Sequence, residues 1–249
     1  MEIERPTIQG QEEDDEDDCV WLDEAFFVNQ SYETRTFAYG SHVLRLLCLE
    51  SASTDYDLTG QLVWPGAELL NYHLAQNSDF LTGCSVIELG SGVGVTGLLC
   101  SKFCRQVVMT DHNDIVLKVL KQNIGLQSPA ETSSCAEMTS EKLEWGNYDQ
   151  LLKILEKFPE GFDLVLGADI CFQQGSIPLL FDTVEQLLQF GHKRCSKFML
   201  AYVSRAKSID TMVAAEAKKH GLKMREVQGS RSMVAGGSLE GVIFEFVLH

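Results

Sequence analysis

The apolar positions of the chain fall into runs of two kinds. Short continuous runs predict buried strands, and longer segments with apolar residues three or four positions apart predict amphipathic helices. From residue 61 onward the two kinds alternate. The predicted helices lie at about 65–77, 98–104, 113–125, 151–158, 177–190 and 209–220, and the predicted strands at 86–89, 106–111, 134–138, 162–169, 197–203, 222–227 and 242–248.

This alternation predicts an α/β fold in which helices cover both faces of a seven-strand, mostly parallel sheet. We therefore expect a Rossmann-like three-layer sandwich. The chain closes differently, because the strands at 222–227 and 242–248 are joined by a glycine-bearing loop, 229–237, and not by a helix. A hydride-transfer Rossmann domain would more often continue the alternation.

The residues before this main domain, which we place at 61–249, have a different character. Residues 1–18 hold nine acidic residues and one basic residue, a net charge of −8, so we expect residues 1–19 to be a disordered acidic tail. We expect residues 20–60 to form a small N-terminal β segment of two or three strands, packed as a lid on the main domain. Its apolar runs lie at 26–28, 34–39 and 43–49, and residues 51–60 are polar and predicted to be a loop.

Length and composition set broad limits. With 249 residues, 45% of them apolar, the chain fits one large α/β domain with a modest N-terminal extension. A run of about 18 apolar residues is missing from the sequence, which argues against a membrane span. The first residues lack the basic and apolar regions of a secretory signal, so we expect a cytoplasmic or nuclear protein.

The net charge of −16 argues against nucleic acid as the main partner, because phosphate binding requires clustered Lys and Arg. A basic protein partner fits this charge better, although a merely soluble acidic surface is the simpler explanation. The eight cysteines are scattered with no C-x-x-C pair, so we expect no metal site. We expect a monomer.

Candidate chemistry concentrates in residues 84–111, where an apolar run, a glycine cluster, a helix-length segment and a second apolar run follow one another. Gly90 and Gly92 would let the backbone turn sharply and let a ligand press against exposed N–H groups at the start of the helix. Asp111 would lie at the carboxyl end of the neighbouring strand, where a carboxylate can accept hydrogen bonds from both hydroxyls of a ribose.

Two cofactors compete for such a site. The letters Gly92-x-Gly94-x-x-Gly97 match a dinucleotide fingerprint, but they begin two residues too late after the strand. The cluster that begins directly after the strand, Glu88-x-Gly90-x-Gly92-x-Gly94, resembles motif I of the class I S-adenosylmethionine-dependent methyltransferases. In that family the acid before the glycines helps to hold the methionine end of the cofactor. An ordinary strand-to-helix turn remains the alternative.

Four stretches together resemble methyltransferase family 16, a seven-strand group that includes protein-lysine methyltransferases. They are the Trp64 segment, residues 88–97 with Asp111, residues 143–146 and residues 167–172. The resemblance implies a sheet whose last strand is antiparallel, with S-adenosylmethionine as cofactor. It implies that Trp64 lines the pocket, that the backbone at Gly90, Ser91, Gly92 and Gly94 passes under the cofactor, that Glu88 and Asp111 hold its methionine and ribose, that Trp145 lies against the adenine, and that Ala168 lies near the sulfonium.

The acidic end of the strand at 162–169 matches the family's Asp/Glu-x-x-Tyr/Phe element, here Asp169 to Phe172. The resemblance implies that Asp169 accepts a hydrogen bond from a target amine and that Phe172 walls the channel and contacts the methylated cation. Alternatively, Asp169 is the N-cap of a helix that starts at Ile170. Phenylalanine lacks the hydroxyl with which tyrosine could orient an amine, so lysine, arginine and histidine all remain open as targets.

The leading hypothesis is therefore an S-adenosylmethionine-dependent methyltransferase acting on a lysine of a protein substrate. A small-molecule methyltransferase on the same fold is the alternative enzyme, followed by a nicotinamide oxidoreductase. A non-catalytic protein that binds partners through its acidic tail is a different class, disfavoured because the glycines and acids of the motifs are intact. The group that would remove the amine proton stays open among Asp169, water and His112.

Overall fold

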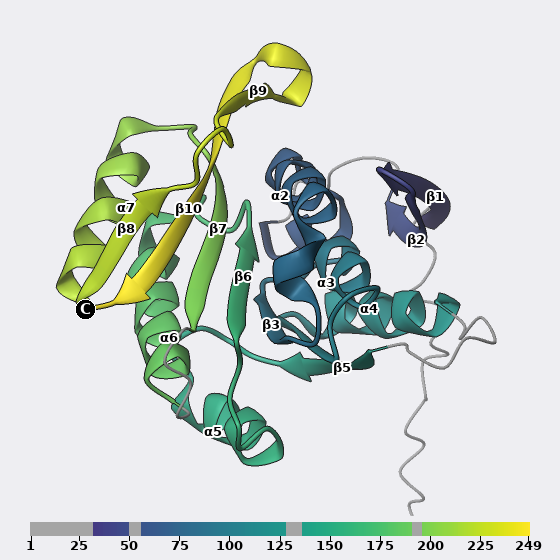
Figure 1. Ribbon diagram of the computed structural model, residues 1–249, viewed down its shortest axis with the longest axis horizontal. Helices are drawn as coiled ribbons and strands as arrows, with labels where there is room; N and C mark the ends of the chain where they lie inside the picture. The colour runs from purple at the N-terminus through teal and green to yellow at the C-terminus, as the bar shows by residue number, and fades with distance from the viewer. Residues whose placement is uncertain (1–31, 50–55, 128–135, 191–195) are drawn as a thin grey trace, which may run out of the picture. The chain divides into compact units, whose positions relative to one another are not determined.

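The computed structural model describes residues 32–49, 56–127, 136–190 and 196–249 (Figure 1). Its central sheet has the strand order β5-β4-β3-β6-β7-β10-β8, and the short strand β9 pairs with β10 off this path. The predicted acidic tail and the predicted strand at 26–28 lie outside the described residues. The strand bounds are β3 Ser85–Leu89, β4 Gln106–Asp111, β5 Glu137–Lys142, β6 Leu164–Ala168, β7 Lys197–Val203, β8 Leu222–Glu226, β9 Ser232–Val234 and β10 Leu239–Leu248.

Strand direction follows the Rossmann-like prediction. The pairs β3–β4, β4–β5, β3–β6 and β6–β7 are parallel, while β10 is antiparallel to both β7 and β8. The predicted antiparallel last strand is therefore confirmed. Within this sheet β4 and then β5 lie successively outward on one side of β3, and the chain then crosses to the other side of β3 to form β6. That reversal places a crevice outside the carboxyl ends of β3 and β6.

Helices cover both faces of the sheet (Figure 1). Successive strand residues alternate between two apolar cores, so Leu164 and Leu166 face one core while Val165 faces the other. The first core lies under α2 (Pro65–Gln76), α3 (Val95–Cys100) and α4 (Asp114–Leu126). The second lies under α5 (Tyr148–Lys157), α6 (Ile177–Gln189) and α7 (Lys207–Lys219). The three-layer architecture is thus confirmed.

The N-terminal β segment contains an antiparallel hairpin of β1 (Tyr32–Tyr39) and β2 (His42–Leu49), which turns at Gly40 with a positive φ of 60°. Asn123 of α4 binds the free edge of β2. Its side-chain oxygen accepts from the Leu47 N–H at 2.7 Å, and its nitrogen donates to the Leu47 carbonyl at 3.0 Å and to the Val93 carbonyl at 2.9 Å. One buried amide therefore joins the hairpin to the loop that precedes α3.

Three predicted segments differ from the structure. The first helix after the glycines, α3, ends at Cys100, earlier than expected. The weak strand expected at 134–138 is β5 at Glu137–Lys142; it is a half-exposed edge strand of mostly polar residues, so no apolar run marks it. The end of the predicted loop at 51–60 is a 3₁₀ helix, η1 (Tyr56–Gln61), while residues 50–55 lie outside the described residues.

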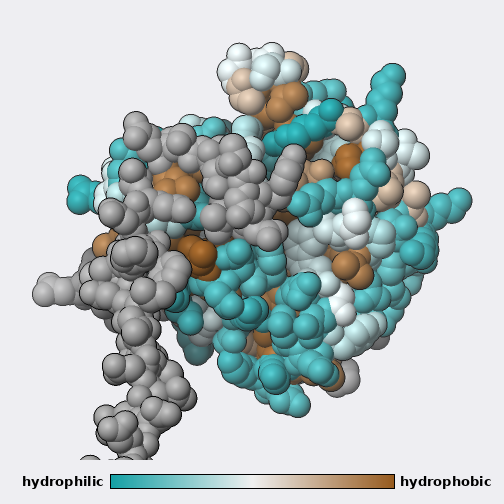
Figure 2. Space-filling model, turned by 180° about the vertical axis from the view of Figure 1, so that it is seen from behind, coloured by the Kyte–Doolittle hydropathy of each residue, from teal (hydrophilic) through white to brown (hydrophobic). Residues whose placement is uncertain are grey.

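The apolar patches on one face of the described residues are the places where a partner or a membrane could bind. Figure 2 shows the face opposite that of Figure 1, where hydrophilic side chains dominate and apolar ones lie in small separate patches. Among the helices of the described residues, none has the length and apolar character needed to cross a membrane.

Candidate active site

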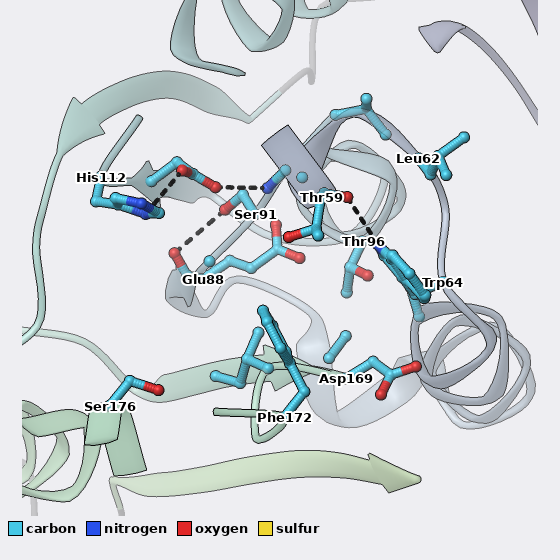
Figure 3. Close-up of a pocket in the computed structure, with 18 of the residues that line it drawn as sticks. Thr59, Leu62, Trp64, Glu88, Ser91, Thr96, His112, Asp169, Phe172 and Ser176 are labelled. Carbon is cyan, nitrogen blue, oxygen red and sulfur yellow. Dashed lines mark hydrogen bonds and ion pairs between the residues drawn. The ribbon is translucent and has the colours of Figure 1, made fainter. Parts of the chain in front are cut away.

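A cavity of about 520 Å³ opens at the carboxyl ends of β3, β4 and β6 (Figure 3). It lies at the crevice that the strand order creates. Every site residue predicted from the sequence lines it except Gly94. Gly94 instead begins α3 with φ 90°, and a Cβ there would lie 2.3 Å from a Leu120 methyl carbon. The lining residues from the prediction are Trp64, Glu88, Gly90, Ser91, Gly92, Asp111, Trp145, Ala168, Asp169 and Phe172.

The floor of the cavity is backbone that admits no side chain. Gly90 and Gly92 have φ values of 63° and 54°, a region that favours glycine. A Cβ on Gly90 would lie 2.9 Å from Ile170 Cγ2, and one on Gly92 would lie 2.5 Å from the Gly60 carbonyl oxygen. The two glycines therefore keep the surface under a ligand flat and close to the chain.

Ser91 fixes this loop with its own hydroxyl. The hydroxyl donates to the Glu88 carbonyl at 3.2 Å and accepts from the Thr110 N–H at 3.0 Å. The Ser91 backbone N–H donates to the Thr110 carbonyl at 2.8 Å. The loop after β3 is thus tied to the end of β4, which carries Asp111.

Asp111 presents a rigid carboxylate to the cavity. The residue is 6% exposed, one carboxylate oxygen accepts from the Gly92 N–H at 3.1 Å, and the other accepts from the Asn113 N–H at 3.1 Å. His112 Nδ1 lies 3.4 Å from the second oxygen. Because each carboxylate oxygen has two lone pairs, acceptor capacity is left for the hydroxyls of a ligand.

Glu88 is a second buried acid, at 3% exposure, on the side of the cavity that faces α3. Its carboxylate accepts from the Gly97 N–H at 3.0 Å. Burial disfavours the charged form and raises the pKa of Glu88 to about 7, against the opposing effect of its hydrogen bonds. The nearby Thr96 hydroxyl is buried and has no well-formed hydrogen bond to any described residue. Acid and hydroxyl together form a polar corner suited to a cation that donates hydrogen bonds.

Two tryptophans wall the cavity. The Trp64 indole N–H donates to the Thr59 carbonyl at 2.8 Å, which ties Trp64 to η1 just before α2. Trp145 follows β5 and is partly buried against the second core. Its ring carbon Cζ2 would lie 3.3 Å from a Cβ on Gly90, so the ring borders the glycine floor. Large apolar faces on either side suit a planar ring system.

Asp169 does not cap a local helix, so that alternative is wrong. The residue has φ 59°, and the next helical turn begins only at Gln174. Its carboxylate instead accepts from the Gly66 N–H at 3.1 Å, in the first turn of α2, and forms a two-pronged ion pair with Arg205. Figure 3 shows the carboxylate pointing toward the start of α2, while the Phe172 ring points into the cavity. Phe172 is 42% exposed and lies at the rim.

A model of the lysine methyltransferase family matches residues 47–218, more than half of the chain. The chain belongs to this lysine methyltransferase family. It is 32% identical over 161 residues to the protein N-lysine methyltransferase METTL21A of Mus musculus, covering 63% of this chain and 64% of that protein. It is 37% identical over 129 residues to EEF1A lysine methyltransferase 3 of Xenopus tropicalis, covering 50% and 51%. The chain thus spans between half and two thirds of the length of these relatives.

Solved structures agree in fold alone. The magnesium protoporphyrin IX methyltransferase ChlM of Synechocystis PCC 6803 superposes with a TM-score of 0.52 at 12% identity, covering 74% of this chain and 81% of that chain. The methyltransferase domain of bacterial CtHen1 gives a TM-score of 0.52 at 14% identity, covering 73% and 98%.

All predicted site residues lie within the region that matches the lysine methyltransferase family. Sequence reasoning missed several contributors to the cavity, among them Thr59 and Gly60 of η1, Thr96 of α3, and Arg205 after β7. Thr59 and Gly60 stand in a polar stretch with no motif. Thr96 lies in a helix that was predicted to begin only at residue 98. Arg205 carried a usable signal, because it follows a buried strand at the same edge of the sheet as the other site residues.

Proposed function

We propose that this chain is an S-adenosylmethionine-dependent methyltransferase that methylates the ε-amine of a lysine in a protein substrate. One observation carries the proposal: the glycine floor, Asp111 and Glu88 all line the same cavity. They do so in a chain that belongs to the lysine methyltransferase family. Its relatives from mouse and frog are named as lysine methyltransferases, which supports the choice of lysine as the target.

The residues present fit the cofactor at each of its parts. The glycine floor would accept the ribose and the methionine chain, since the positive-φ turn at Gly90 and Gly92 brings bare backbone to the cavity. Asp111 would accept from the ribose hydroxyls, and Glu88 with the Thr96 hydroxyl would hold the ammonium group. Trp145 would lie against the adenine. A cavity of about 520 Å³ falls within the usual range for small-ligand sites.

The cofactor, when bound, supplies a methyl group on a positively charged sulfur, open to in-line attack by a neutral amine. The chain's own residues position the two reactants, which is the chief contribution to such a reaction. We assign Phe172 the wall of the target channel, since its ring points into the cavity and its remaining surface is exposed at the rim. A ring face there would stabilise the cationic, methylated product.

The nature of the partner is part of the proposal. We propose a basic protein substrate, which the net charge of −16 supports. We also propose a monomeric enzyme in the cytoplasm or nucleus. On the face shown in Figure 2 the apolar patches are small and separate, which supports a monomer.

Calorimetric titration with S-adenosylhomocysteine tests the cofactor assignment. We expect micromolar binding by the wild-type chain and about 10- to 100-fold weaker binding by Asp111→Ala, because hydrogen bonds to a charged group contribute about 1.5–3 kcal/mol. The matched control is Asp114→Ala, an acid three residues away whose side chain is 72% exposed and paired with Lys142. It should bind as the wild type does. A folded wild-type protein that binds no S-adenosylhomocysteine would rule out the proposal.

A further inference from the structure

The Asp169 side chain is shut off from the cavity whose wall its residue helps to form. It is only 2% exposed, and its carboxylate accepts from three donors: two guanidinium N–H groups of Arg205, one at 2.8 Å, and the Gly66 N–H at 3.1 Å. Three of the four lone pairs of the carboxylate are thus taken by protein donors, and the burial of the side chain leaves an approaching amine little access to the fourth. The role that family resemblance implies for this acid, accepting from the target amine, does not fit this arrangement.

Three chain segments meet at this ion pair. Asp169 follows β6, Arg205 follows β7, and Gly66 lies in the first turn of α2. The approach is so close that a Cβ on Gly66 would lie 2.7 Å from Asp169 Cβ. The Arg205 guanidinium carbon also lies 5.9 Å from the centre of the Trp64 ring, within cation–π range. The arginine thus ties two sides of the cavity wall together.

What the ion pair holds is the turn at Asp169. That residue is one of two non-glycine residues with positive φ among those described, a conformation that costs energy and persists only when its surroundings fix it. The turn places Ile170 against Gly90 of the glycine floor, where its side chain lies within 3 Å of the Cβ positions of both Gly90 and Gly167. It also sends Phe172 to the rim.

From this geometry we infer that Arg205 is a positioning residue: it anchors Asp169, so that residues 169–172 form one wall of the target channel. The Asp169 carboxylate is accordingly the anchor point for Arg205 and not the acceptor of the target amine. The inference rests on the proposed function, since it concerns the target side of the same site. Asp169 in turn raises the pKa of Arg205 by its hydrogen bonds, so the arginine stays charged.

The two roles for Asp169 predict opposite outcomes in a double-mutant cycle. Arg205→Met removes the partner and leaves a buried carboxylate unpaired, which is strongly destabilising. Adding Asp169→Asn removes that stranded charge, and asparagine tolerates the positive φ. If Asp169 is an anchor, the double variant should be more stable and transfer more methyl than Arg205→Met alone. If Asp169 accepts from the target amine, the double variant should transfer less methyl than Arg205→Met.

The experiment compares wild type, Arg205→Met, Arg205→Lys, Asp169→Asn and the double variant. Three quantities are measured: thermal unfolding, S-adenosylhomocysteine binding, and transfer of labelled methyl from S-adenosylmethionine to a total protein extract, the last two well below the unfolding temperature. The control is Arg231→Met, which breaks an exposed arginine pairing with Glu226 and Glu240, three residues that do not line the cavity.

We expect Arg205→Met to lower methyl transfer about tenfold or more relative to the wild type. The double variant should transfer at least about threefold more methyl than Arg205→Met and should unfold at a higher temperature, because the two residues act as a coupled pair. The affinity of every variant for S-adenosylhomocysteine should stay within about threefold of the wild-type value. General destabilisation would not lower methyl transfer while leaving this affinity unchanged. Arg205→Lys should be intermediate, since an ammonium cannot pair in two prongs. Arg231→Met should transfer as the wild type does.

Additive losses in the double variant, or loss of cofactor binding together with transfer in Arg205→Met, would overturn the positioning role. If the wild-type protein neither binds S-adenosylhomocysteine nor transfers methyl, the proposed function fails and the positioning role falls with it. The unfolding temperatures then still report whether Arg205 and Asp169 are paired, which separates the two failures.

Discussion

At the scale of single residues, the cavity depends on positions where a side chain is excluded. Gly92 combines a φ of 54° with a Cβ position only 2.5 Å from a backbone oxygen, that of Gly60. Backbone cannot swing aside as a flexible side chain does. This residue holds the floor under the ribose in the proposed complex.

We therefore expect Gly92→Ala to destabilise the fold by about 1–3 kcal/mol and to weaken S-adenosylhomocysteine binding at least about tenfold, since both strain and steric contact oppose the substitution. The matched control is Gly125→Ala in α4, where φ is ordinary and nothing lies within 4 Å of a Cβ. That change should stabilise the protein by about 0.5–1 kcal/mol, because alanine is favoured over glycine in a helix. Urea unfolding and calorimetry check both. Equal effects of the two substitutions would contradict the assigned role of Gly92.

Glu88 makes the site sensitive to pH. Its pKa is raised by burial to about 7, and an ammonium ligand favours the ionised form. Binding of S-adenosylhomocysteine should therefore weaken as the pH falls below 7, by about tenfold per pH unit if only the ionised form binds. The Glu88→Gln variant should bind more weakly and show a flatter dependence. Calorimetry between pH 5 and 8 measures it, and an unchanged slope in the variant would refute the assignment.

The same pKa has the opposite effect on the stability of the ligand-free protein. Glu88 holds its proton more tightly in the folded state, at about 7, than at the ordinary glutamate value of 4.5. Its contribution to the free energy of unfolding is fully present below 4.5 and is lost as the pH rises through 7. Wild type should thus lose stability relative to Glu88→Gln across this window, by about 1.4 kcal/mol per pH unit at most.

At the scale of elements, one side chain forms hydrogen bonds both to the hairpin of β1 and β2 and to the loop before α3. Asn123 is fully buried and makes all three of its hydrogen bonds to backbone groups of Leu47 and Val93. Substituting it leaves those groups without partners. The hairpin and the loop before α3 should therefore respond together.

We expect Asn123→Ala to lower the free energy of unfolding by about 2–4 kcal/mol, because each stranded buried group costs about 1–3 kcal/mol. The control is Gln127→Ala one turn later in the chain, whose exposed amide donates to the Arg45 carbonyl at 2.9 Å. Its loss should cost less than about 1 kcal/mol. Urea denaturation compares the two. Similar values for both variants would show that the buried amide does not couple the hairpin to the loop.

Strands and helices with apolar runs were predictable from the sequence, since period and burial coincide in them. The strand β7 lies at the predicted 197–203, and the helix α6 ends within one residue of its predicted end. The edge strands β5 and β9 were misplaced or missed because an edge strand needs no apolar run. The 3₁₀ turn η1 was missed because it packs against residues far away in the sequence, with Gly60 against Val116 and Gly92.

At the scale of the whole molecule, the location of the site was predictable from the sequence, but the hydrogen bonds and ion pairs within it were not. Glycine and acid motifs at the ends of β3, β4 and β6 pointed to one edge of one sheet, and the cavity is there. Which donors bind the Asp169 carboxylate depends on where β7 ends and where α2 begins in space. No local pattern encodes that meeting of three segments.

The proposed function requires that the protein transfer a methyl group to lysine. The most direct test incubates the wild-type protein and Asp111→Ala with a protein extract and S-adenosylmethionine whose methyl group carries heavy isotopes, and then identifies the labelled residues by mass spectrometry. We expect heavy methyl groups on lysine side chains with the wild-type protein and about tenfold fewer or none with the variant. Label found only on small molecules or on other residue types, or equal labelling by the variant, would contradict it.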